Sequence, residues 1–391
     1  MSGFSFVGAL PSSKSLFNRA LLVQSFAPHL RLVGHSQADD VEAMRRALQQ
    51  MKSHLPIDCG SAGTVLRFMA LRAAREPGRH HLYGSKRLFE RPQQELNKIL
   101  SQLGCEVELT EEHLKLRSWG WKMVGDALHV PTDRSSQFAS AVLLSAWDLP
   151  FELCMWLGPK PVSEGYLEMT LALVKRLGMN VQRGPNEIRV PRGQKVMADG
   201  LTVEPDLSSL FALAACAAVG GQIRVSGVPQ DSLQPDRLFM PLLQKMGVPF
   251  HLDRGQLEVH RAEKMKAIEV DLTGAPDLFP GLAALAALAE GESHLKGATH
   301  LVYKESDRRS RIVELLRNCG RDVRVENDLV IIRGQRTPQL KQKLRFDPDQ
   351  DHRLAFAAAI LKLSGEPIEV LHPLVVNKSF PEFWQILGVA P

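Results

Sequence analysis

The cysteine content excludes two common architectures. Five cysteines are scattered along 391 residues, with no C-x-x-C pair and no histidine at a metal-ligand spacing. This pattern is typical of reduced core thiols in an intracellular protein rather than of a disulfide scaffold or a zinc site. We therefore expect neither disulfide bonds nor a bound metal.

Targeting and membrane signals are also lacking. The first residues, Met-Ser-Gly-Phe, show no basic segment followed by an apolar one, so no secretory signal is expected. The most apolar run, Leu210 to Val219, has about half the length that a membrane span needs. These absences predict a cytoplasmic protein.

The chain has few aromatic residues and only a small excess of positive charge. The chain has only three tyrosines and no Lys/Arg run interleaved with aromatics, which argues against nucleic-acid binding. The net charge of +5 suits small acidic ligands. With 44% apolar residues, a chain of this length predicts a globular protein of two domains. No heptad pattern or exposed apolar stripe indicates association, so we expect a monomer.

A repeated pattern indicates how the chain is organised. An apolar helix, then Leu, Met or Cys followed by Gly, then a strand recurs with glycines at 104, 178, 247, 320 and 388, spaced 74, 69, 73 and 68 residues apart. A glycine directly after a helix favours the left-handed C-cap that turns the chain into a strand. With a degenerate first copy ending near Met51, the pattern predicts six α/β units, divided into two domains of three. The alternating strands expected in them are 114–118, 187–191, 256–260 and 329–333.

The N-terminal segment is the first candidate anion site. Ser12 and Ser13 are natural N-cap residues before an apolar-periodic helix, so Lys14 and Ser15 lie at a helix N-terminus, where an anion is favoured. Arg19 falls on the same helix face one turn later. The alternative is a capped amphipathic helix with two solvated cations.

Other helix starts carry similar chemistry. Segment 58–67 is rich in small residues that let backbone N–H groups approach a ligand, at a helix expected to begin near Thr64. The alternative is an ordinary connection from a strand to a helix. Arg91 is either a ligand clamp or a solvated arginine, and Pro92 is expected in the first turn of the next helix. Ser135, Ser136 and Gln137 are either a cap or an oxygen-rich ligand site. Segment 206–209 has the same design and is interpreted as mostly structural.

The C-terminal half holds three further polar helix starts. Asp277 precedes an apolar helix and is either an N-cap or a functional carboxylate. Residues 304–308 place four charges before an amphipathic helix, for which a capping box is the alternative reading. Residues 351–353 again precede an apolar helix, and residues 377–383 lie near the C-terminus.

Taken together and in this order, seven segments resemble the 5-enolpyruvylshikimate-3-phosphate synthase family. They span residues 13–381, which is nearly the whole chain, and are Ser13-Lys14-Ser15-x-x-Asn18-Arg19, Gly60-Ser61-Ala62-Gly63-Thr64, Glu90-Arg91-Pro92, Ser135-Ser136-Gln137-Phe138, Lys304-Glu305-Ser306-Asp307-Arg308, Asp351-His352-Arg353 and Lys378-Ser379-Phe380-Pro381.

The resemblance implies an α/β, two-domain enolpyruvyl transferase fold. Each domain has three βαβαββ repeats, and the active site lies in the interdomain cleft. The chain crosses between domains twice, so the implied domains are residues 1–12 with 206–391, and residues 13–205.

The resemblance also implies the reaction and its site residues. The enolpyruvyl group of phosphoenolpyruvate is transferred to the 5-hydroxyl of shikimate 3-phosphate, and phosphate is released without a metal or organic cofactor. The residues implied for shikimate 3-phosphate are Lys14, Ser15, Arg19, Ser135, Ser136, Gln137, Ser163, Tyr166, Asp277, His300 and Lys304. Those implied for phosphoenolpyruvate are Lys14, Gly63, Arg91, Gln137, Arg308, Arg353 and Lys378.

The chemistry explains why such side chains are needed. The two substrates bring two phosphates and two carboxylates together, and fixed Lys and Arg side chains screen their repulsion. Addition and elimination through a tetrahedral intermediate also need a base for the hydroxyl and an acid for the methylene carbon. Asp277, Glu305 and Lys14 are the candidates, and the sequence leaves their assignment open.

The sequence departs from the family pattern at several positions. Ser61 replaces a usual Asn, Phe68 stands where Pro or Leu is common, Gly165 replaces a frequent Pro, and His300 replaces an Asn. Gly63 is retained, which in the family accompanies sensitivity to the inhibitor glyphosate. None of these departures removes a proposed catalytic group.

Two other functions are compatible with parts of this pattern. UDP-N-acetylglucosamine enolpyruvyl transferase shares the fold but needs a cysteine on the loop where Arg91 lies, and no cysteine is near it. A non-catalytic anion-binding relative of the same fold predicts loss of Asp277, Glu305 or Lys14, and all three are present.

Overall fold

The computed structural model describes residues 3–158 and 162–391, which form two compact units. Unit 1 comprises the N-terminal residues up to Ser13 together with Glu204–Pro391, and unit 2 comprises Lys14–Val203. The boundaries implied by the resemblance, after residues 12 and 205, lie within two residues of these divisions. Met1 and Ser2, at the start of the first implied domain, lie outside the described residues.

Unit 2 contains two four-stranded sheets and one parallel strand pair. The first sheet has the order β3 (Ile57–Asp58), β4 (Gly78–Tyr83), β6 (His113–Ser118), β5 (Glu106–Leu109). The second has the order β7 (Leu128–Val130), β8 (Leu153–Leu157), β10 (Glu187–Val190), β9 (Gln182–Arg183), and β11 (Gly200–Thr202) pairs with β2 (Arg31–Val33). Its helices are α1 (Lys14–Gln24), α2 (Asp39–Lys52), α3 (Gly63–Ala73), α4 (Lys86–Glu90), α5 (Gln94–Gln102), α6 (Gln137–Leu144) and α7 (Glu164–Arg176).

Unit 1 repeats this plan. Its sheets have the orders β1 (Phe4–Ala9), β12 (Gly221–Ser226), β14 (Gln256–His260), β13 (Phe250–Asp253) and β15 (Glu269–Asp271), β16 (Gly291–Lys296), β18 (Leu329–Gly334), β17 (Asp322–Glu326), with β19 (Leu344–Phe346) beside β20 (Ile368–Val370). Its α-helices are α8 (Leu207–Gly220), α9 (Phe239–Lys245), α10 (Phe279–Ala286), α11 (Arg308–Asn318), α12 (His352–Leu363) and α13 (Phe383–Leu387). Short 3₁₀ helices span Pro235–Leu238, Pro276–Leu278, Thr299–Tyr303 and Pro373–Lys378.

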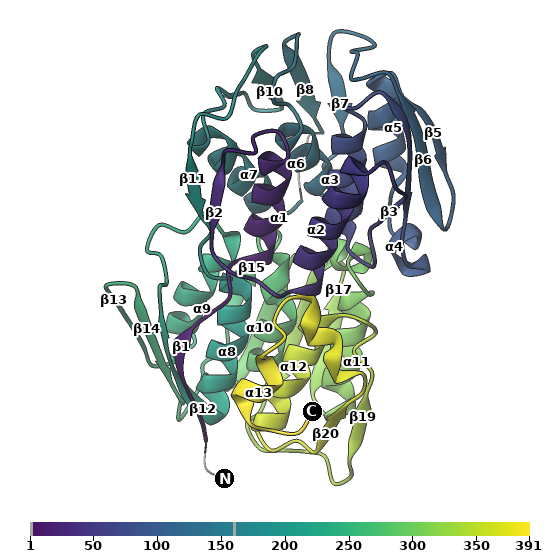
Figure 1. The fold of residues 1–391 in the computed structure, drawn as a ribbon. Coiled ribbons are helices and arrows are strands. Elements are labelled where there is room, and N and C mark those ends of the chain that lie inside the picture. The colour runs from purple at the N-terminus through teal and green to yellow at the C-terminus, as the bar shows by residue number, and fades with distance from the viewer. Residues whose placement is uncertain (1–2, 159–161) are drawn as a thin grey trace. The chain divides into compact units, whose positions relative to one another are not determined.

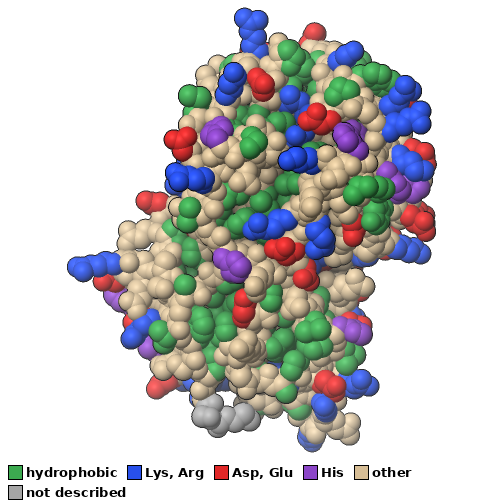
Figure 2. Space-filling model, viewed as in Figure 1, with side chains coloured by type: hydrophobic (Ala, Val, Ile, Leu, Met, Phe, Trp, Pro, Cys, Tyr) green, Lys and Arg blue, Asp and Glu red, His purple; other side chains and the backbone are tan. Residues whose placement is uncertain are grey.

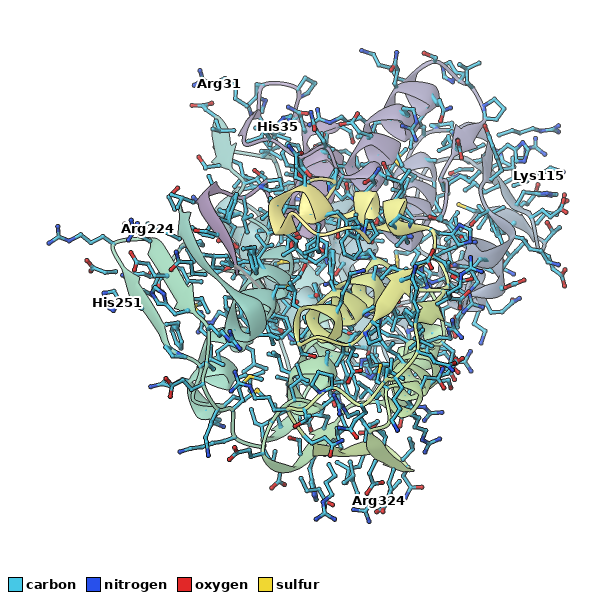
Figure 3. The ribbon with its side chains drawn as sticks, turned by 90° about the horizontal axis from the view of Figure 1, so that it is seen from below. Arg31, His35, Lys115, Arg224, His251 and Arg324 are labelled. Atoms are coloured by element: carbon cyan, nitrogen blue, oxygen red, sulfur yellow. The ribbon has the colours of Figure 1, made fainter. Side chains whose placement is uncertain are left out.

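Each four-stranded sheet combines one parallel pair with two antiparallel pairs. One face carries apolar side chains toward helices and the other is polar, as the period-2 alternation of the strands requires. In β6, Leu114 and Leu116 are buried whereas Lys115 and Arg117 are exposed. Figure 3 shows Lys115, Arg224 and Arg324 at the periphery, pointing away from their sheets. The mixed α/β architecture with several sheets agrees with the fold that the resemblance implies.

The core of unit 1 is built on three helices that are apolar on nearly all sides. Residues 207–219 of α8, all of α10 and residues 352–361 of α12 are buried, and the three helices pack on one another (Figure 1). A helix that is apolar all round is stable only when it is surrounded by protein. In unit 2, α3 and α6 pack together in the same way.

The repeat glycines have the backbone conformation predicted from their positions directly after helices. Gly104, Gly178, Gly247, Gly320 and Gly388 all have positive φ values, between 63° and 109°. The expected strands 114–118, 187–191, 256–260 and 329–333 correspond to β6, β10, β14 and β18. These predictions are confirmed.

The prediction for Pro92 was wrong. It was expected in the first turn of a helix, but Arg91 is the C-cap residue of α4, Gln93 is the N-cap of α5, and α5 begins at Gln94. Arg91 has an extended backbone, as is usual for a residue that precedes proline. Arg91 and Pro92 therefore lie in the connection between two helices.

Candidate functional site

In unit 2, Lys14 is held by a carboxylate that sequence reasoning missed. Lys14 is the first residue of α1, and its Nζ lies 2.9 Å from Oδ2 of Asp40, in the first turn of α2. Both side chains are largely buried, with exposed fractions of 12% and 8%. The pair fixes the amine at the start of α1, where the expected anion site lies.

Arg19 is buried one turn further along α1. Its Nε donates to Oγ1 of Thr170 at 2.8 Å, and its two Nη atoms donate to the carbonyl oxygens of Ser15 and Tyr166. Burial lowers the pKa of Arg19 to about 10, so the side chain is still charged at neutral pH. The guanidinium thus connects Ser15 of α1 to Tyr166 in the first turn of α7, which are two of the residues implied for shikimate 3-phosphate.

Arg91 and Gly63 form the second part of the unit 2 site. Arg91 is 7% exposed, and its Nε and Nη1 have no hydrogen-bond partner within the described residues. A Cβ built on Gly63 would lie 2.7 Å from Nη1 of Arg91, so only glycine leaves room for this guanidinium. Gly63 is the first residue of α3, so the charge lies at a helix N-terminus. A buried guanidinium with unused donors at such a place is suited to bind an anion.

Arg67 joins the remaining candidates of unit 2, and sequence reasoning missed this role. Its Nη1 donates to Oε1 of Gln137 at 2.8 Å and to Oγ of Ser135 at 3.2 Å, and its Nη2 donates to the carbonyl of Pro92 at 3.0 Å. Gln137 in turn donates to Oγ1 of Thr64 at 3.2 Å. Arg67 therefore fixes the start of α6 relative to the connection that carries Arg91.

Two serines implied for shikimate 3-phosphate precede helices. Ser136 is the buried N-cap residue of α6, but its side chain makes no capping hydrogen bond. Ser163 precedes α7 with φ at 54°, a left-handed conformation that is uncommon for serine. Neither side chain serves as a cap, and a strained backbone such as that of Ser163 often marks a functional site.

In unit 1, Asp277 lies between two arginines. Its Oδ1 accepts from Nη1 of Arg308 at 3.0 Å, and its Oδ2 accepts from Nη2 of Arg353 at 2.7 Å. Arg308 also bonds to Glu305 at 2.9 Å and to the fully buried Asp351 at 2.8 Å. Three carboxylates thus surround a guanidinium that is itself fully buried.

The charges in this cluster control its ionisation. Burial opposes the charged form of Asp277, but Arg353, Arg308 and Lys304 outweigh it and hold the pKa of the carboxyl well below its usual range. Burial likewise disfavours the charged form of Arg308, but Asp351 and the other two carboxylates raise its pKa above the usual value. Asp277 is therefore a carboxylate at neutral pH.

The alternative in which Asp277 is an N-cap does not hold. Neither the 3₁₀ helix Pro276–Leu278 nor α10 has a side-chain capping bond at its N-terminus. By contrast, Asp206, Asp307 and Asp351 each accept a backbone N–H at the starts of α8, α11 and α12. Asp277 instead directs its carboxylate at arginines.

His300, Lys304 and Lys378 lie beside short 3₁₀ helices. His300 is buried within Thr299–Tyr303, and its Nε2 has no hydrogen-bond partner in the part of unit 1 that the structure describes. Burial, followed by the charge of Lys304, lowers the pKa of His300 to about 3, so the imidazole is neutral. Lys304 follows this 3₁₀ helix directly, and the buried Lys378 ends Pro373–Lys378.

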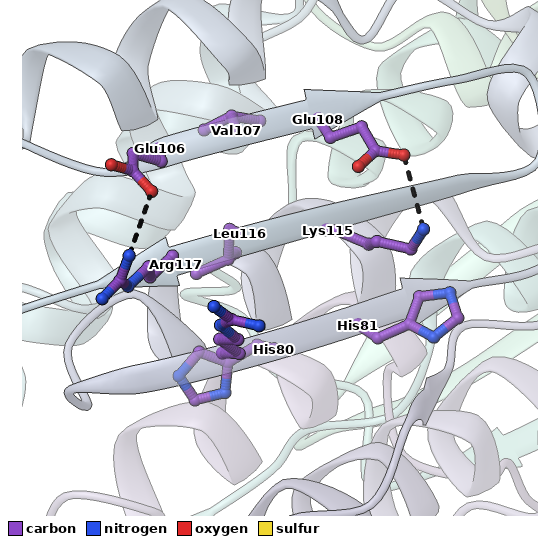
Figure 4. Close-up of a pocket in the computed structure, with 9 residues that line it drawn as sticks. His80, His81, Glu106, Val107, Glu108, Lys115, Leu116 and Arg117 are labelled. Carbon is purple, nitrogen blue, oxygen red and sulfur yellow. Dashed lines mark hydrogen bonds and ion pairs between the residues drawn. The ribbon is translucent and has the colours of Figure 1, made fainter.

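Open hollows also lie on the polar faces of the sheets. A cavity of about 440 Å³ on β4, β6 and β5 is lined by Arg79, His81 and cross-strand pairs (Figure 4). Glu106 pairs with Arg117 at 3.8 Å and Glu108 with Lys115 at 3.4 Å, and all four are exposed. Exposed ion pairs of this kind contribute little to folding stability. None of the candidate site residues lines the cavity. Figure 2 shows acidic and basic side chains interspersed over one face.

The described residues contain neither a metal-binding cluster nor a helix that could span a membrane. No group of three or more His, Cys, Asp or Glu side chains in residues 3–158 and 162–391 is arranged to hold a metal ion. Within the same ranges, no helix combines the length and apolar character needed to cross a membrane. The five cysteines are free, and all except the partly exposed Cys154 are buried.

Comparison with known proteins identifies the family. A family model for EPSP synthase (3-phosphoshikimate 1-carboxyvinyltransferase) matches residues 25–387. The chain is 33% identical to the 3-phosphoshikimate 1-carboxyvinyltransferase of Methanoculleus marisnigri, covering 96% of this chain and 94% of that protein. It is 32% identical to the enzyme of the same name from Syntrophobacter fumaroxidans, covering 98% and 97%.

Solved structures show the same fold. EPSP synthase from Acinetobacter baumannii superposes with a TM-score of 0.75 and 20% identity, covering 99% of this chain and 95% of that one. The enolpyruvyl transferase NikO from Streptomyces tendae gives a TM-score of 0.73 at 13% identity, with the same coverage. The resemblance read from the seven motifs is confirmed: the chain belongs to the EPSP synthase (3-phosphoshikimate 1-carboxyvinyltransferase) family.

Proposed function

We propose that the protein transfers the enolpyruvyl group of phosphoenolpyruvate to the 5-hydroxyl of shikimate 3-phosphate. In the addition step the hydroxyl oxygen bonds to C2 of phosphoenolpyruvate, the hydroxyl proton leaves to a base, and C3 gains a proton. In the elimination step C3 loses a proton and phosphate departs from C2, which restores the double bond. The products are 5-enolpyruvylshikimate 3-phosphate and inorganic phosphate.

The observation that carries the proposal is the buried guanidinium of Arg91 beside Gly63. Its Nε and Nη1 have no partner among the described residues, and it lies at the N-terminus of α3. An unsatisfied buried guanidinium is costly, and charge-assisted hydrogen bonds to the oxygens of a carboxylate or a phosphate offset this cost. Phosphoenolpyruvate carries both groups.

The carboxylates of unit 1 suggest how its arginines are kept ready. Asp277 and Glu305 bond to Arg308, and Asp277 also bonds to Arg353. An anionic substrate competes with these carboxylates for the same donors. When phosphoenolpyruvate takes them, Asp277 loses its closest cations and becomes a better base, because its low pKa depends on those charges.

Three groups are suited to move protons, and their assignment is left open. Lys14 is fixed by Asp40, whereas Asp277 and Glu305 are each about one-fifth exposed and so accessible to a substrate. The remaining implied residues hold shikimate 3-phosphate. Arg19 and Lys304 supply its cationic contacts, the serines and Tyr166 hydrogen-bond to it, and His300 offers a neutral imidazole nitrogen.

The acceptor is tested by mass spectrometry of the products. The enzyme is incubated with phosphoenolpyruvate and either shikimate 3-phosphate or UDP-N-acetylglucosamine, and the enolpyruvyl adduct is sought in each mixture. The proposal expects an adduct of shikimate 3-phosphate alone. An adduct of the nucleotide sugar would assign the rival transferase activity, and no adduct in either mixture would favour a non-catalytic anion-binding protein.

Four further properties belong to the proposal. The enzyme acts as a monomer in the cytoplasm, in the pathway to chorismate and the aromatic amino acids. Glyphosate inhibits it in competition with phosphoenolpyruvate, because Gly63 is retained beside Arg91. Sedimentation tests whether the enzyme is a monomer. Inhibition measured at varied phosphoenolpyruvate concentration tests whether glyphosate competes with this substrate.

A further inference from the structure

Ser208, which the sequence suggested was structural, contacts an arginine of the candidate site. It is the second residue of α8 and is buried. Its Oγ lies 2.5 Å from Oδ1 of Asp206 and 3.2 Å from Nη2 of Arg353. The hydroxyl therefore lies between a helix-capping carboxylate and a guanidinium 145 residues away in the sequence.

The direction of these hydrogen bonds is fixed by chemistry. A serine hydroxyl has one proton to donate, and a carboxylate can only accept, so the Ser208 proton points at Asp206. The Ser208 lone pairs then face Arg353, which can only donate. Ser208 thus donates to Asp206 and accepts from Arg353, and this chain of two hydrogen bonds holds Nη2 of Arg353 in a defined place.

Asp206 is itself firmly anchored. Its Oδ1 also accepts the backbone N–H of Ser209 at 2.8 Å, and its own N–H donates to the carbonyl of Pro11 at 3.0 Å. The N–H of Leu207 donates to Oε1 of Gln234 at 3.0 Å. Ser208 therefore ties Arg353 to a rigid part of unit 1.

Arg353 also bonds to Asp277, which is expected to release it. Arg353 donates to the carboxylate of Asp277 at 2.7 Å, and a substrate anion competes for this donor. When the substrate anion replaces Asp277 as the acceptor, the bond to Ser208 still holds the guanidinium of Arg353. Because the guanidinium is planar, fixing one Nη atom restricts the orientation of the others.

We propose that Ser208 is a positioning residue that orients Arg353 for the anionic groups of phosphoenolpyruvate. This inference rests on the proposed function, which makes phosphoenolpyruvate the ligand of Arg353. It predicts that loss of the Ser208 hydroxyl weakens the use of phosphoenolpyruvate selectively, because Ser208 contacts the substrate only through Arg353.

The test compares Ser208→Ala with Ser209→Ala. Ser209 is the next residue in the same helix turn and is also buried, but its Oγ has no hydrogen-bond partner within the described residues. We expect Ser208→Ala to raise the KM for phosphoenolpyruvate about tenfold, in line with loss of a hydrogen bond to a charged group. The KM for shikimate 3-phosphate should change less than about twofold, and Ser209→Ala should match the wild type.

A second variant separates positioning from stability. Ser208→Thr keeps the hydroxyl and is expected to restore most of the lost affinity, and thermal unfolding shows whether each variant is folded. Similar kinetic constants for Ser208→Ala and Ser209→Ala, with an active wild type, would overturn the inference alone. A wild type that releases no phosphate from the two substrates would overturn the proposed function and this inference with it.

Discussion

The carboxylate of Asp277 lies 2.7 Å from Nη2 of Arg353, and the same carboxylate accepts from Arg308 at 3.0 Å. Although burial opposes it, the surrounding cations keep the pKa of Asp277 well below its usual range. In this state Asp277 is a weak base, and its partners are the arginines proposed to bind phosphoenolpyruvate. In the proposed mechanism, one exchange of hydrogen bonds therefore both binds the anion and activates the base.

Asp277→Asn tests this exchange. The amide keeps the shape of the side chain but cannot take a proton, so kcat should fall at least about a hundredfold, the usual contribution of a general base. The matched control is Asp307→Asn, because Asp307 is a helix cap outside the cluster and Asn caps equally well. A variant at 277 that keeps wild-type kcat would remove Asp277 from the chemistry.

Gly63→Ala tests the contact with Arg91. The new Cβ would lie 2.7 Å from Nη1, so the guanidinium must move, and the KM for phosphoenolpyruvate should rise about fivefold, equivalent to roughly 1 kcal/mol. Gly184→Ala is the control, since a Cβ there meets only ordinary contacts at 3.6 Å. Equal KM values for Gly63→Ala and the wild type would show that Arg91 does not contact phosphoenolpyruvate.

Asp40→Asn tests the pair with Lys14. The amide cannot neutralise the ammonium or hold it as firmly, so we expect kcat to fall about tenfold. Asp39, the exposed neighbour in the same helix turn, provides the control Asp39→Asn, which should change kcat less than about twofold. If both variants lose activity to the same degree, the ion pair has no special role.

His300→Asn tests the buried neutral imidazole, which faces Lys304, Asp328, Arg308 and Asp277. An unfolded histidine takes up a proton below a pKa of about 6.5, whereas folded His300 does so only near a pKa of about 3. Between these values the unfolded state binds more protons, so His300 costs stability as pH falls, by about 2 kcal/mol at pH 5.

His300→Asn should therefore lose less stability than the wild type between pH 7.5 and pH 5, as measured by urea unfolding. The exposed His251, labelled in Figure 3, provides the control His251→Asn, which should follow the wild type. Parallel stability curves for His300→Asn and the wild type would contradict the buried neutral state.

Local signals in the sequence predicted the repeat and much of the fold. The glycines at the ends of helices required left-handed conformations, and the alternating strands required one apolar face, so both could be read without a structure. Pro92 was misplaced because a proline that begins a helix and a proline between two helices have the same local signature. The seven motifs identified the family because of their order, since each motif alone was weak.

Contacts between distant segments could not be predicted in this way. Asp206, Asp277 and Asp351 each stand before a core helix of unit 1, and their surroundings in the sequence are similar. Asp206 and Asp351 cap helices, and Asp351 also bonds to Arg308, whereas Asp277 lies within a 3₁₀ helix, caps no helix and bonds to both Arg308 and Arg353. The roles of Asp40, Arg67 and Ser208 likewise depend on partners between 25 and 145 residues away.

The most direct test of the enolpyruvyl transferase function measures inorganic phosphate released with phosphoenolpyruvate and shikimate 3-phosphate, supplied together and singly. Release is expected only when both substrates are present, in a one-to-one ratio with the enolpyruvyl product. Lys14→Met is expected to abolish this release. Release from phosphoenolpyruvate alone, or no release with both substrates present, would contradict this function.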